Sequence, residues 1–183
     1  MNWNPKLAQF TDISAIQALI PSSVLTLQAP YYSQAQMDAA LGPVFGVDRQ
    51  LIHDGTYYVV ENDDRIIGCG GWSRRKTLFG GDQCRSSPDP ELNPASEPAR
   101  IRAFFVHPDW ARRGVGRSIL LACEAAIRAA RFHSIELVAT LAGEPLYASC
   151  GYAATERFNI DLNDGLRLPV VRMRKPIPPD SGL

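Results

Sequence analysis

One segment of the sequence, residues 101–121, constrains the fold more than any other. Its apolar start, residues 101–106, predicts a buried strand; a short basic loop with two glycines follows, and then a helix begins. Glycines let a backbone turn sharply, and a helix start adds unpaired N–H groups and a partial positive charge. Full charges come from Arg112, Arg113 and Arg117. The segment therefore predicts a binding site for a phosphate or pyrophosphate group.

The composition is that of one ordinary globular domain. The chain has 183 residues, of which 45% are hydrophobic and 21% charged, enough to bury a core of its own. The formal net charge is zero, so no chain-wide bias favours nucleic acid or a membrane surface. No apolar run approaches the roughly 20 residues that span a bilayer, and the N-terminus lacks a signal-peptide pattern. We expect one domain over residues 1–183, with its core at about 6–175 and a tail at 176–183, in the cytoplasm and without nucleic-acid or membrane partners.

The cysteine pattern indicates free thiols. Cys69, Cys84, Cys123 and Cys150 are widely spaced, and no C-x-x-C pair is present. Three of them lie in apolar or glycine-rich element patterns. We therefore expect reduced cysteines in a reducing cytoplasm and no metal site.

The order of the predicted elements indicates the fold class. Helices are expected over 11–20 (stopped by Pro21-Ser22-Ser23), 33–41, 49–53, 114–130 and from 144 to Gly151, and strands over 56–61, 65–72, 101–106, 134–140, 152–162 and 166–174. Residues 74–100 predict a long loop. Glycines at 68, 70 and 71 predict a bulge in their strand or the close approach of another element. This order indicates a mixed α/β (α+β) domain with one central sheet of about six to seven strands flanked by helices.

Residues 106–118 could belong to one of three known kinds of phosphate-binding motif. A dinucleotide fingerprint needs Gly-x-Gly-x-x-Gly directly after a strand, but Ile119 occupies the third glycine position and seven residues separate the strand from Gly114. A Walker loop needs Gly-Lys-Ser/Thr, which is absent. The third interpretation fits: the run Val-His-Pro-Asp-Trp-Ala-Arg-Arg-Gly-Val-Gly resembles motif A of the GNAT family of N-acetyltransferases.

The resemblance extends over nearly the whole chain. Residues 146–152, Leu-Tyr-Ala-Ser-Cys-Gly-Tyr, are similar to the family's second signature, a short helix carrying a tyrosine that is followed by glycine and an aromatic residue. The order of elements from Lys6 to Lys175 also matches. The resemblance implies a single GNAT-type acyl-CoA N-acyltransferase domain.

The resemblance also implies a cosubstrate and the residues that hold it. Acetyl-CoA would contact the strand and the N–H groups of the loop, through Phe104, Phe105, Val106, Arg112, Arg113, Gly114, Val115, Gly116, Arg117 and Ser118. Tyr147 would be the general acid for the leaving thiolate, since a phenol is protonated at neutral pH. The alternative for Tyr147 is a packed aromatic with a satisfied hydroxyl. Two positions depart from the family pattern: Ala111 stands where Arg or Gln is usual, and Thr140 where Asn is frequent.

A general base is not evident. Many relatives carry Glu or Asp on the central strand, but residues 100–105 contain no carboxylate. The proton of the acceptor amine is removed either by water or by one of three side chains, Glu61, Asp82 or His107. Of these, His107 is better interpreted as a loop residue near the cofactor. Cys150 has no histidine or acid nearby in sequence, so packing explains it better than nucleophilic catalysis.

The acceptor pocket is expected on the far side of the sheet. Its candidate residues are Tyr31, Tyr32, Trp72, Arg74 and Arg102, with Ser73, Arg75 and Phe79 nearby in sequence. Adjacent aromatics with arginine suit a small aromatic or carboxylate-bearing amine. The alternatives are that Tyr31 and Tyr32 pack a helix turn and that the arginines at 74 and 75 form a solvated turn. A buried Arg102 would need a carboxylate from the protein or from the substrate.

The functional prediction is acetyl transfer from acetyl-CoA to the primary amine of a small molecule, by direct transfer and without a metal. One alternative is a protein or peptide amine as acceptor. Another is a non-catalytic acyl-CoA-binding sensor, which the missing strand carboxylate suggests. A homodimer through the hairpin at 152–174 is a further expectation.

Overall fold

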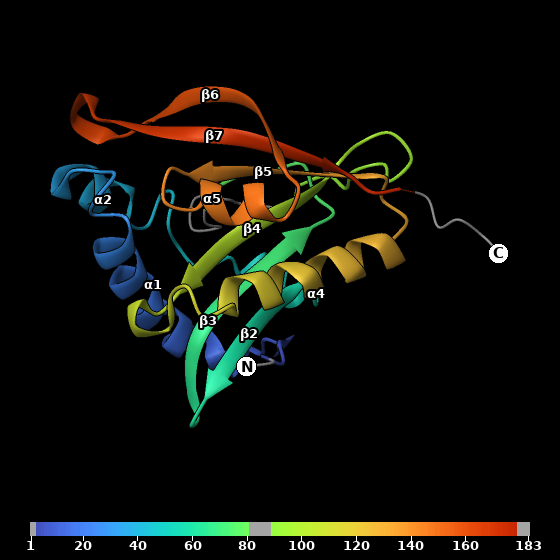
Figure 1. The fold of residues 1–183 in the computed structure, drawn as a ribbon, viewed down its shortest axis with the longest axis horizontal. Coiled ribbons are helices and arrows are strands. Elements are labelled where there is room, and N and C mark those ends of the chain that lie inside the picture. Colours follow the sequence, from blue (N-terminus) through green and yellow to red (C-terminus); the bar gives the residue numbers. More distant parts are fainter. Residues whose placement is uncertain (1–2, 81–88, 179–183) are drawn as a thin grey trace.

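A single mixed sheet runs through the molecule (Figure 1). The computed structural model describes residues 3–80 and 89–178, and in this part of the chain seven strands follow the order β1-β2-β3-β4-β5-β7-β6. The strands are β1 (Lys6–Leu7), β2 (Tyr57–Asn62), β3 (Arg65–Ser73), β4 (Ala99–Val106), β5 (Ser134–Thr140), β6 (Ala153–Asp161) and β7 (Arg167–Pro176). Only β4 and β5 pair in parallel. The mixed sheet with flanking helices confirms the predicted fold class.

Helices cover both faces of the sheet. The helices are α1 (Ile13–Leu27), α2 (Gln34–Ala40), α3 (Arg49–His53), α4 (Val115–Ala129) and α5 (Glu144–Ser149). One buried cluster joins α1, α2 and α3 to the sheet through Ile16, Met37 and Leu51. A second cluster joins α4 and α5 to the other face through Ile119 and Tyr147. The sheet therefore separates an α1 face from an α4 face (Figure 1).

The parallel strands β4 and β5 separate soon after they begin. They pair only at Ala99 with Ile135 and at Arg100 with Glu136. Beyond that point β4 stays on β3, while β5 stays on β7 to its last residue. Ala103 has a positive φ of 56°, and the register of β3 against β4 shifts beside it. The bulge and the early separation leave a gap in the sheet between residues 102–106 and 137–140.

Two of the β3 glycines allow other parts of the fold to approach closely. A Cβ at Gly68 would lie 2.4 Å from Cγ1 of Val115, and one at Gly70 would lie 2.5 Å from the Phe104 ring. Against β2 the register shifts between Val60, which pairs with Gly68, and Glu61, which pairs with Ile66, so Ile67 is an extra residue in β3. The prediction of a bulge or a close approach in this strand is therefore confirmed, because both occur.

Replacing Gly68 by alanine is expected to destabilise the fold by about 1–3 kcal/mol, because the new methyl group overlaps a stiff, buried valine. Urea denaturation measures the loss. In the double variant Gly68→Ala/Val115→Ala, the loss in the free energy of unfolding should be about 1 kcal/mol smaller than the sum of the losses in the two single variants. Strict additivity would contradict the proposed contact.

Two boundaries differ from the sequence prediction. Helix α1 does not stop at Pro21 but continues to Leu27, because Ser23 and Val24 in its last two turns are buried and hold them in place. Tertiary packing here outweighs the backbone hydrogen bond that proline removes. At the other end, Pro176 still belongs to β7, and Ile177 is buried and donates its N–H to the His133 carbonyl at 2.8 Å. The expected tail at 176–183 therefore begins later, and residues 179–183 lie outside the described part.

The expectation that no apolar run is long enough to span a bilayer is wrong for the segment Phe10–Leu27. It has 18 residues and a mean hydropathy of 1.3, which suffices by length and composition. In the fold it belongs to α1 and the turn before it, and Ile16, Leu19 and Val24 are buried in the core cluster. Core helices of folded domains meet the same criterion, so the segment by itself indicates no membrane span.

Candidate functional site

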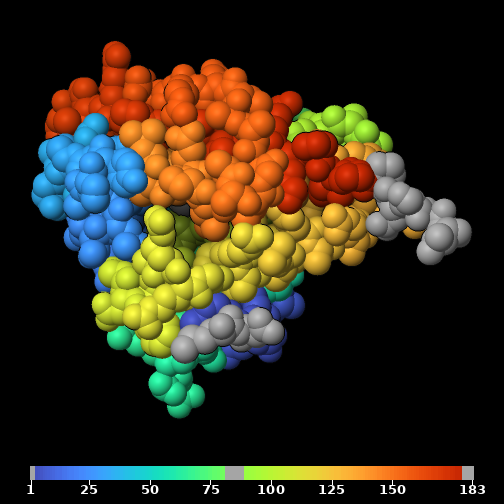
Figure 2. Space-filling view, in the orientation of Figure 1, coloured from blue at the N-terminus to red at the C-terminus, as the bar shows by residue number. Residues whose placement is uncertain are grey.

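A cavity of about 520 Å³ occupies the gap between β4 and β5. Its walls come from both sides of the sheet: α1 and residues 44–46 on one side, and the start of α4 together with α5 on the other. In Figure 2 a hollow opens between the yellow segment after β4 and the orange segment that contains α5. Because the gap passes through the sheet, two ligands can enter from opposite faces and meet beside β4.

Residues 112–117, which we call the anion-binding loop, lie at the α4 side of the cavity. Arg112 and Gly114 have positive φ angles of 62° and 86°, and α4 begins immediately afterwards. The first helical bond runs from the Ser118 N–H to the Gly114 carbonyl at 2.9 Å. No backbone carbonyl of the described residues accepts the N–H groups of 112–117. Unpaired N–H groups in a left-handed turn before a helix form a concave site for an anion.

The predicted cofactor residues divide into two groups in the structure. Most line the cavity: Phe104, Phe105, Val106, Arg112, Gly114, Val115, Gly116 and Arg117. Arg113 and Ser118 do not. The Arg113 guanidinium lies 5.2 Å from the centre of the Trp110 ring. The backbone carbonyl of Arg113 accepts a hydrogen bond from the Trp3 indole N–H at 2.7 Å. The Ser118 hydroxyl donates to the Val115 carbonyl at 2.7 Å. These last contacts fix the shape of the loop and its helix.

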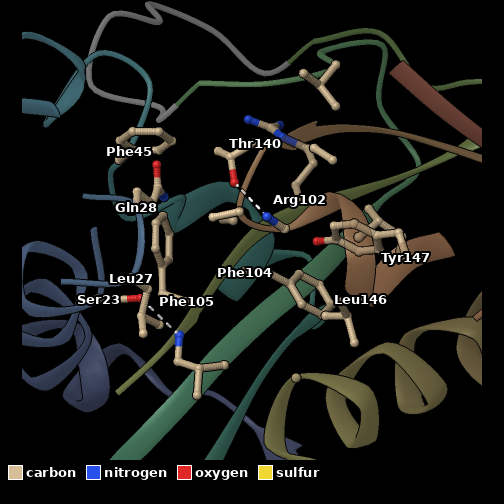
Figure 3. Close-up of a pocket in the computed structure, with 18 of the residues that line it drawn as sticks. Ser23, Leu27, Gln28, Phe45, Arg102, Phe104, Phe105, Thr140, Leu146 and Tyr147 are labelled. Atoms are coloured by element: carbon tan, nitrogen blue, oxygen red, sulfur yellow. Dashed lines mark hydrogen bonds between the residues drawn. The ribbon is translucent and has the colours of Figure 1, made fainter. Parts of the chain in front are cut away.

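The edge of β4 that faces away from β3 is open to the cavity. His107 donates its N–H to Ile67 on β3, whereas the preceding Val106 N–H points the other way and donates to Ser23 Oγ at 3.2 Å (Figure 3). Backbone N–H groups alternate in direction along a strand, so Phe104 presents its backbone to the same open edge as Val106. An extended ligand can therefore pair with β4 where β5 has left it.

Tyr147 projects from α5 into the cavity (Figure 3). Its ring packs edge-on against Phe104 and Tyr152, with centroid separations of 6.1 and 5.8 Å. The hydroxyl has no hydrogen-bond partner among the residues that the structure describes. Burial raises the pKa of Tyr147 well above that of a free phenol. The side chain is therefore a held, protonated donor aimed into the gap.

The described lining residues include no carboxylate and no imidazole. Glu61 lies elsewhere and pairs with Lys6 at 2.7 Å. His107 is held at the loop, where Nε2 lies 2.6 Å from an Arg65 nitrogen. Asp82, the third suggested base, lies outside the described residues. The structure thus brings neither Glu61 nor His107 into the cavity.

The three described cysteines do not line the cavity. Cys69, Cys123 and Cys150 are free thiols, and Cys84 lies outside the described residues. Burial raises the pKa of the Cys69 thiol to about 12 and raises that of Cys123 as well. No cluster of His, Cys, Asp or Glu suited to a metal ion occurs in residues 3–80 and 89–178.

Of the five predicted acceptor residues, the structure brings only Arg102 to the cavity. Tyr31 is exposed, and the Tyr32 hydroxyl donates to the Pro169 carbonyl at 2.7 Å while accepting the Leu141 N–H. Trp72 packs on Phe132 in the cluster on the α4 face, and Arg74 donates to the Asp54 carbonyl. Neither Ser73 nor Arg75 lines the cavity, whereas Phe79 does.

The two positions that depart from the family pattern both line the cavity. Thr140 is the last residue of β5, and its hydroxyl accepts the Gly143 N–H at 3.1 Å, which starts α5 (Figure 3). Ala111 has no polar side chain, so at its end of the loop an anion can be bound only by backbone N–H groups and by Arg112 and Arg117.

The sequence interpretation missed the wall formed by α1. Ser23, Leu27 and Gln28 line the cavity, and all three follow Pro21, where the helix was expected to stop. Phe45, Ile160 and Val170 were missed as well, because they come from loops and strands far apart in sequence. The apolar spacing of Ile20, Val24 and Leu27 was the available signal for the longer helix.

The comparisons agree with the cavity and the fold. A family model described as an acetyltransferase (GNAT) domain matches residues 53–154, more than half of the chain. Among curated proteins, none matches this sequence significantly.

Solved structures with the same fold are numerous. A GCN5-related N-acetyltransferase from Rhodopseudomonas palustris is 19% identical, with 97% of each chain covered and a TM-score of 0.72. YncA from Salmonella typhimurium, solved with its cofactor acetyl-CoA, is 14% identical, with 100% of this chain and 98% of that chain covered and a TM-score of 0.65. The ribosomal-protein-S18-alanine N-acetyltransferase from Escherichia coli is also 14% identical, with 100% and 99% covered and a TM-score of 0.59.

Proposed function

The chain belongs to the GNAT family and is an acetyltransferase, and from this we propose that it transfers the acetyl group of acetyl-CoA to a small primary amine inside the cavity. The observation that carries the proposal is the cavity itself. It has an anion-binding loop at one end, an open strand edge in the middle and a protonated tyrosine aimed into it. This arrangement suits a pyrophosphate, an extended amide-containing arm and a thioester, in that order.

The residues present fit acetyl-CoA. The unpaired N–H groups of 112–117 and the guanidinium groups of Arg112 and Arg117 would hold the pyrophosphate. The open edge of β4 at Phe104 and Val106 would bind the pantetheine amides as a neighbouring strand does. Acetyl-CoA supplies the activated acyl group, and the protein supplies position and charge stabilisation.

The cavity residues provide what direct acyl transfer requires. The Val106 N–H, which lies on the open edge of β4, would exchange its 3.2 Å bond to Ser23 Oγ for one to the thioester carbonyl and polarise that carbonyl as it gains charge. Tyr147 would donate its phenolic proton to the departing thiolate. Holding the amine and the thioester together in one enclosed space contributes a large part of the acceleration. The amine must arrive neutral, because only its lone pair can attack.

We propose that water, rather than a side chain, removes the proton from the amine, since no base lines the described part of the cavity. The logarithm of kcat/KM should then rise with pH at a slope of about one up to the pKa of the acceptor amine. The raised pKa of Tyr147 keeps this acid protonated through pH 10, so no fall is expected there. Initial rates from pH 6 to 10.5 test this. A plateau set by an enzyme group that titrates between pH 6 and 8 would contradict it.

Consumption of acetyl-CoA with a panel of amines tests the proposal as a whole. The panel contains amino acids, polyamines, aromatic amines, aminoglycosides and short lysine peptides, and free thiol is measured as it forms. Turnover with a small-molecule class supports the proposal, and turnover with peptides alone replaces it with a protein acceptor. Tight binding of acetyl-CoA without turnover on any amine would indicate the acyl-CoA sensor instead.

Two further proposals concern the state of the protein. We propose a cytoplasmic location, which the free thiols of the three described cysteines support. A homodimer is supported by β6, which forms one edge of the sheet and is largely exposed along its length. An edge strand of this length can pair with a second copy along its outer edge. Sedimentation equilibrium measures the oligomeric state, and a monomer at micromolar concentration would contradict the dimer.

A further inference from the structure

The part of the cavity on the α1 face has an apolar lining. We call this part the acceptor chamber and define it by Leu27, Gln28, Val44, Phe45, Phe79 and Ile160. Five of these six side chains are hydrocarbon. The chamber lies across the sheet from the anion-binding loop, so it is the space left for the amine once the other half holds the cosubstrate.

The described wall of the chamber offers a carboxylate no cation without a carboxylate partner of its own. Among the described lining residues the charged ones are Arg102, Arg112 and Arg117, and the last two belong to the anion-binding loop. The Arg102 guanidinium lies 2.8 Å from Oδ2 of Asp48, which is fully buried, and it also donates to the Gly80 carbonyl. This arginine already has its carboxylate partner from the protein. A second carboxylate would have to enter an apolar space next to an ion pair whose charges already cancel.

Gln28 is the exception to the apolar lining. The residue is only 8% exposed, and its side-chain Oε1 is buried without a hydrogen-bond partner among the described residues. Its backbone N–H is used within α1, where it donates to the Val24 carbonyl at 3.1 Å. Figure 3 shows the side-chain amide between Phe45 and Phe105. A buried amide oxygen without a partner is costly to the free protein, so a ligand that donates a hydrogen bond to it gains binding energy.

We infer that the acceptor chamber takes an apolar primary amine without a carboxylate, and that the Gln28 amide pairs with a neutral hydrogen-bonding group on its body. Arylalkylamines with a ring hydroxyl or an indole N–H have this chemistry. The inference rests on the proposed function and deepens it. In the reaction the amine nitrogen forms a bond to the acyl carbon, the carbon–sulfur bond breaks, the amine loses one proton to water and the sulfur gains one from Tyr147, which solvent then reprotonates.

Matched amine pairs test the exclusion of carboxylates. 2-Phenylethylamine is compared with phenylalanine, tryptamine with tryptophan, and 3-methylbutylamine with leucine, each with the intact enzyme and acetyl-CoA. We expect the amine without the carboxylate to have a kcat/KM about tenfold higher or more in every pair. Equal or higher values for the amino acids would overturn the inference while leaving the proposed function in place. Binding of acetyl-CoA with turnover on none of these amines would overturn it as well, whereas failure to bind acetyl-CoA would overturn the proposed function itself.

The variant Gln28→Met tests the hydrogen bond. Methionine has nearly the same length and volume but no amide. For 2-phenylethylamine and its three ring-hydroxylated isomers, the wild-type enzyme should prefer at least one hydroxylated isomer by about tenfold, and the variant should lose that preference. The Kd of acetyl-CoA should stay within about twofold in the variant, because Gln28 lies outside the anion-binding loop.

Gln34→Met is the matched control, because Gln34 is exposed on α2 and bonds only to Asp38 among its described neighbours. It should keep the wild-type preference. If Gln28→Met keeps that preference too, or if the wild type shows none, the assignment of Gln28 is overturned.

Discussion

Replacing Tyr147 by phenylalanine is expected to lower kcat by about 10²- to 10³-fold, because the leaving thiolate loses its proton donor. The ring stays in place between Phe104 and Tyr152, so the packing of the cavity wall is kept. The hydroxyl that is removed makes no hydrogen bond within the described residues, so little stability should be lost. Thiol release measures kcat, and titration calorimetry should give a Kd for acetyl-CoA within about twofold of the wild type.

Tyr152→Phe is the matched control for this prediction. Its hydroxyl donates to Glu124 Oε1 at 3.0 Å, in a group that also contains Lys175, and it does not line the cavity. Removing it should cost about 1 kcal/mol of stability with kcat within about threefold of the wild type. If Tyr147→Phe retains full kcat, Tyr147 is a packing residue and the general acid lies elsewhere.

Replacing Gly116 by valine is expected to raise the Kd of acetyl-CoA by about 30-fold or more. Gly116 is a helical residue that lines the cavity, and a Cβ there would lie 3.2 Å from Leu146 and 3.6 Å from Val106. A branched side chain would therefore stand where the phosphates approach the N–H groups of the loop. Loss of charge-assisted hydrogen bonds, worth about 1.5–3 kcal/mol each, accounts for the size of the effect.

Ala125→Val controls for the effect of valine on the helix, because Ala125 is an exposed position of the same helix, α4. This variant should lose only a few tenths of a kcal/mol of stability and keep the wild-type Kd. Titration calorimetry of both variants measures the difference. An unchanged Kd in Gly116→Val would show that the phosphates bind away from this loop.

The anion-binding loop could be predicted from sequence because all of its signals lie close together. The apolar strand, the two glycines, the arginines and the helix start fall within residues 101–121, and each has a local physical meaning. Nothing distant is needed to place Gly114 at a positive φ or α4 directly after it. Tyr147 could be placed for the same reason, since its short helix and the glycine after it are local patterns.

The acceptor side could not be predicted, because it depends on contacts between distant segments. Trp72 was expected near the acceptor, but β3 alternates regularly from Gly68, where a Cβ would meet Val115 of α4, so Trp72 takes the α4 face and packs on Phe132. Alternation shows which residues of a strand share a face, but the helix that covers that face is set by contacts with distant segments. The Arg102 partner, Asp48, comes from a segment before β2, and no local pattern links the two.

Helix α1 shows how packing overrides a local rule. Pro21 is a strong stop signal in the sequence, yet the helix continues for six residues past it, to Leu27. The buried side chains of Ser23 and Val24 hold the extra turns against the sheet. Gln28, at the C-terminal end of this helix, reaches the cavity only because of this extension.

Two-substrate kinetics test the central claim most directly, namely that the cosubstrate and the amine meet in one cavity for direct transfer. Initial rates of thiol release are measured with acetyl-CoA and the best amine varied together, and the intact mass of the protein is recorded during turnover. Reciprocal plots that intersect, with no acetyl group on the protein, are the predicted result. Parallel plots together with an acetylated protein, for example at Cys150, would contradict direct transfer and require an acyl-enzyme.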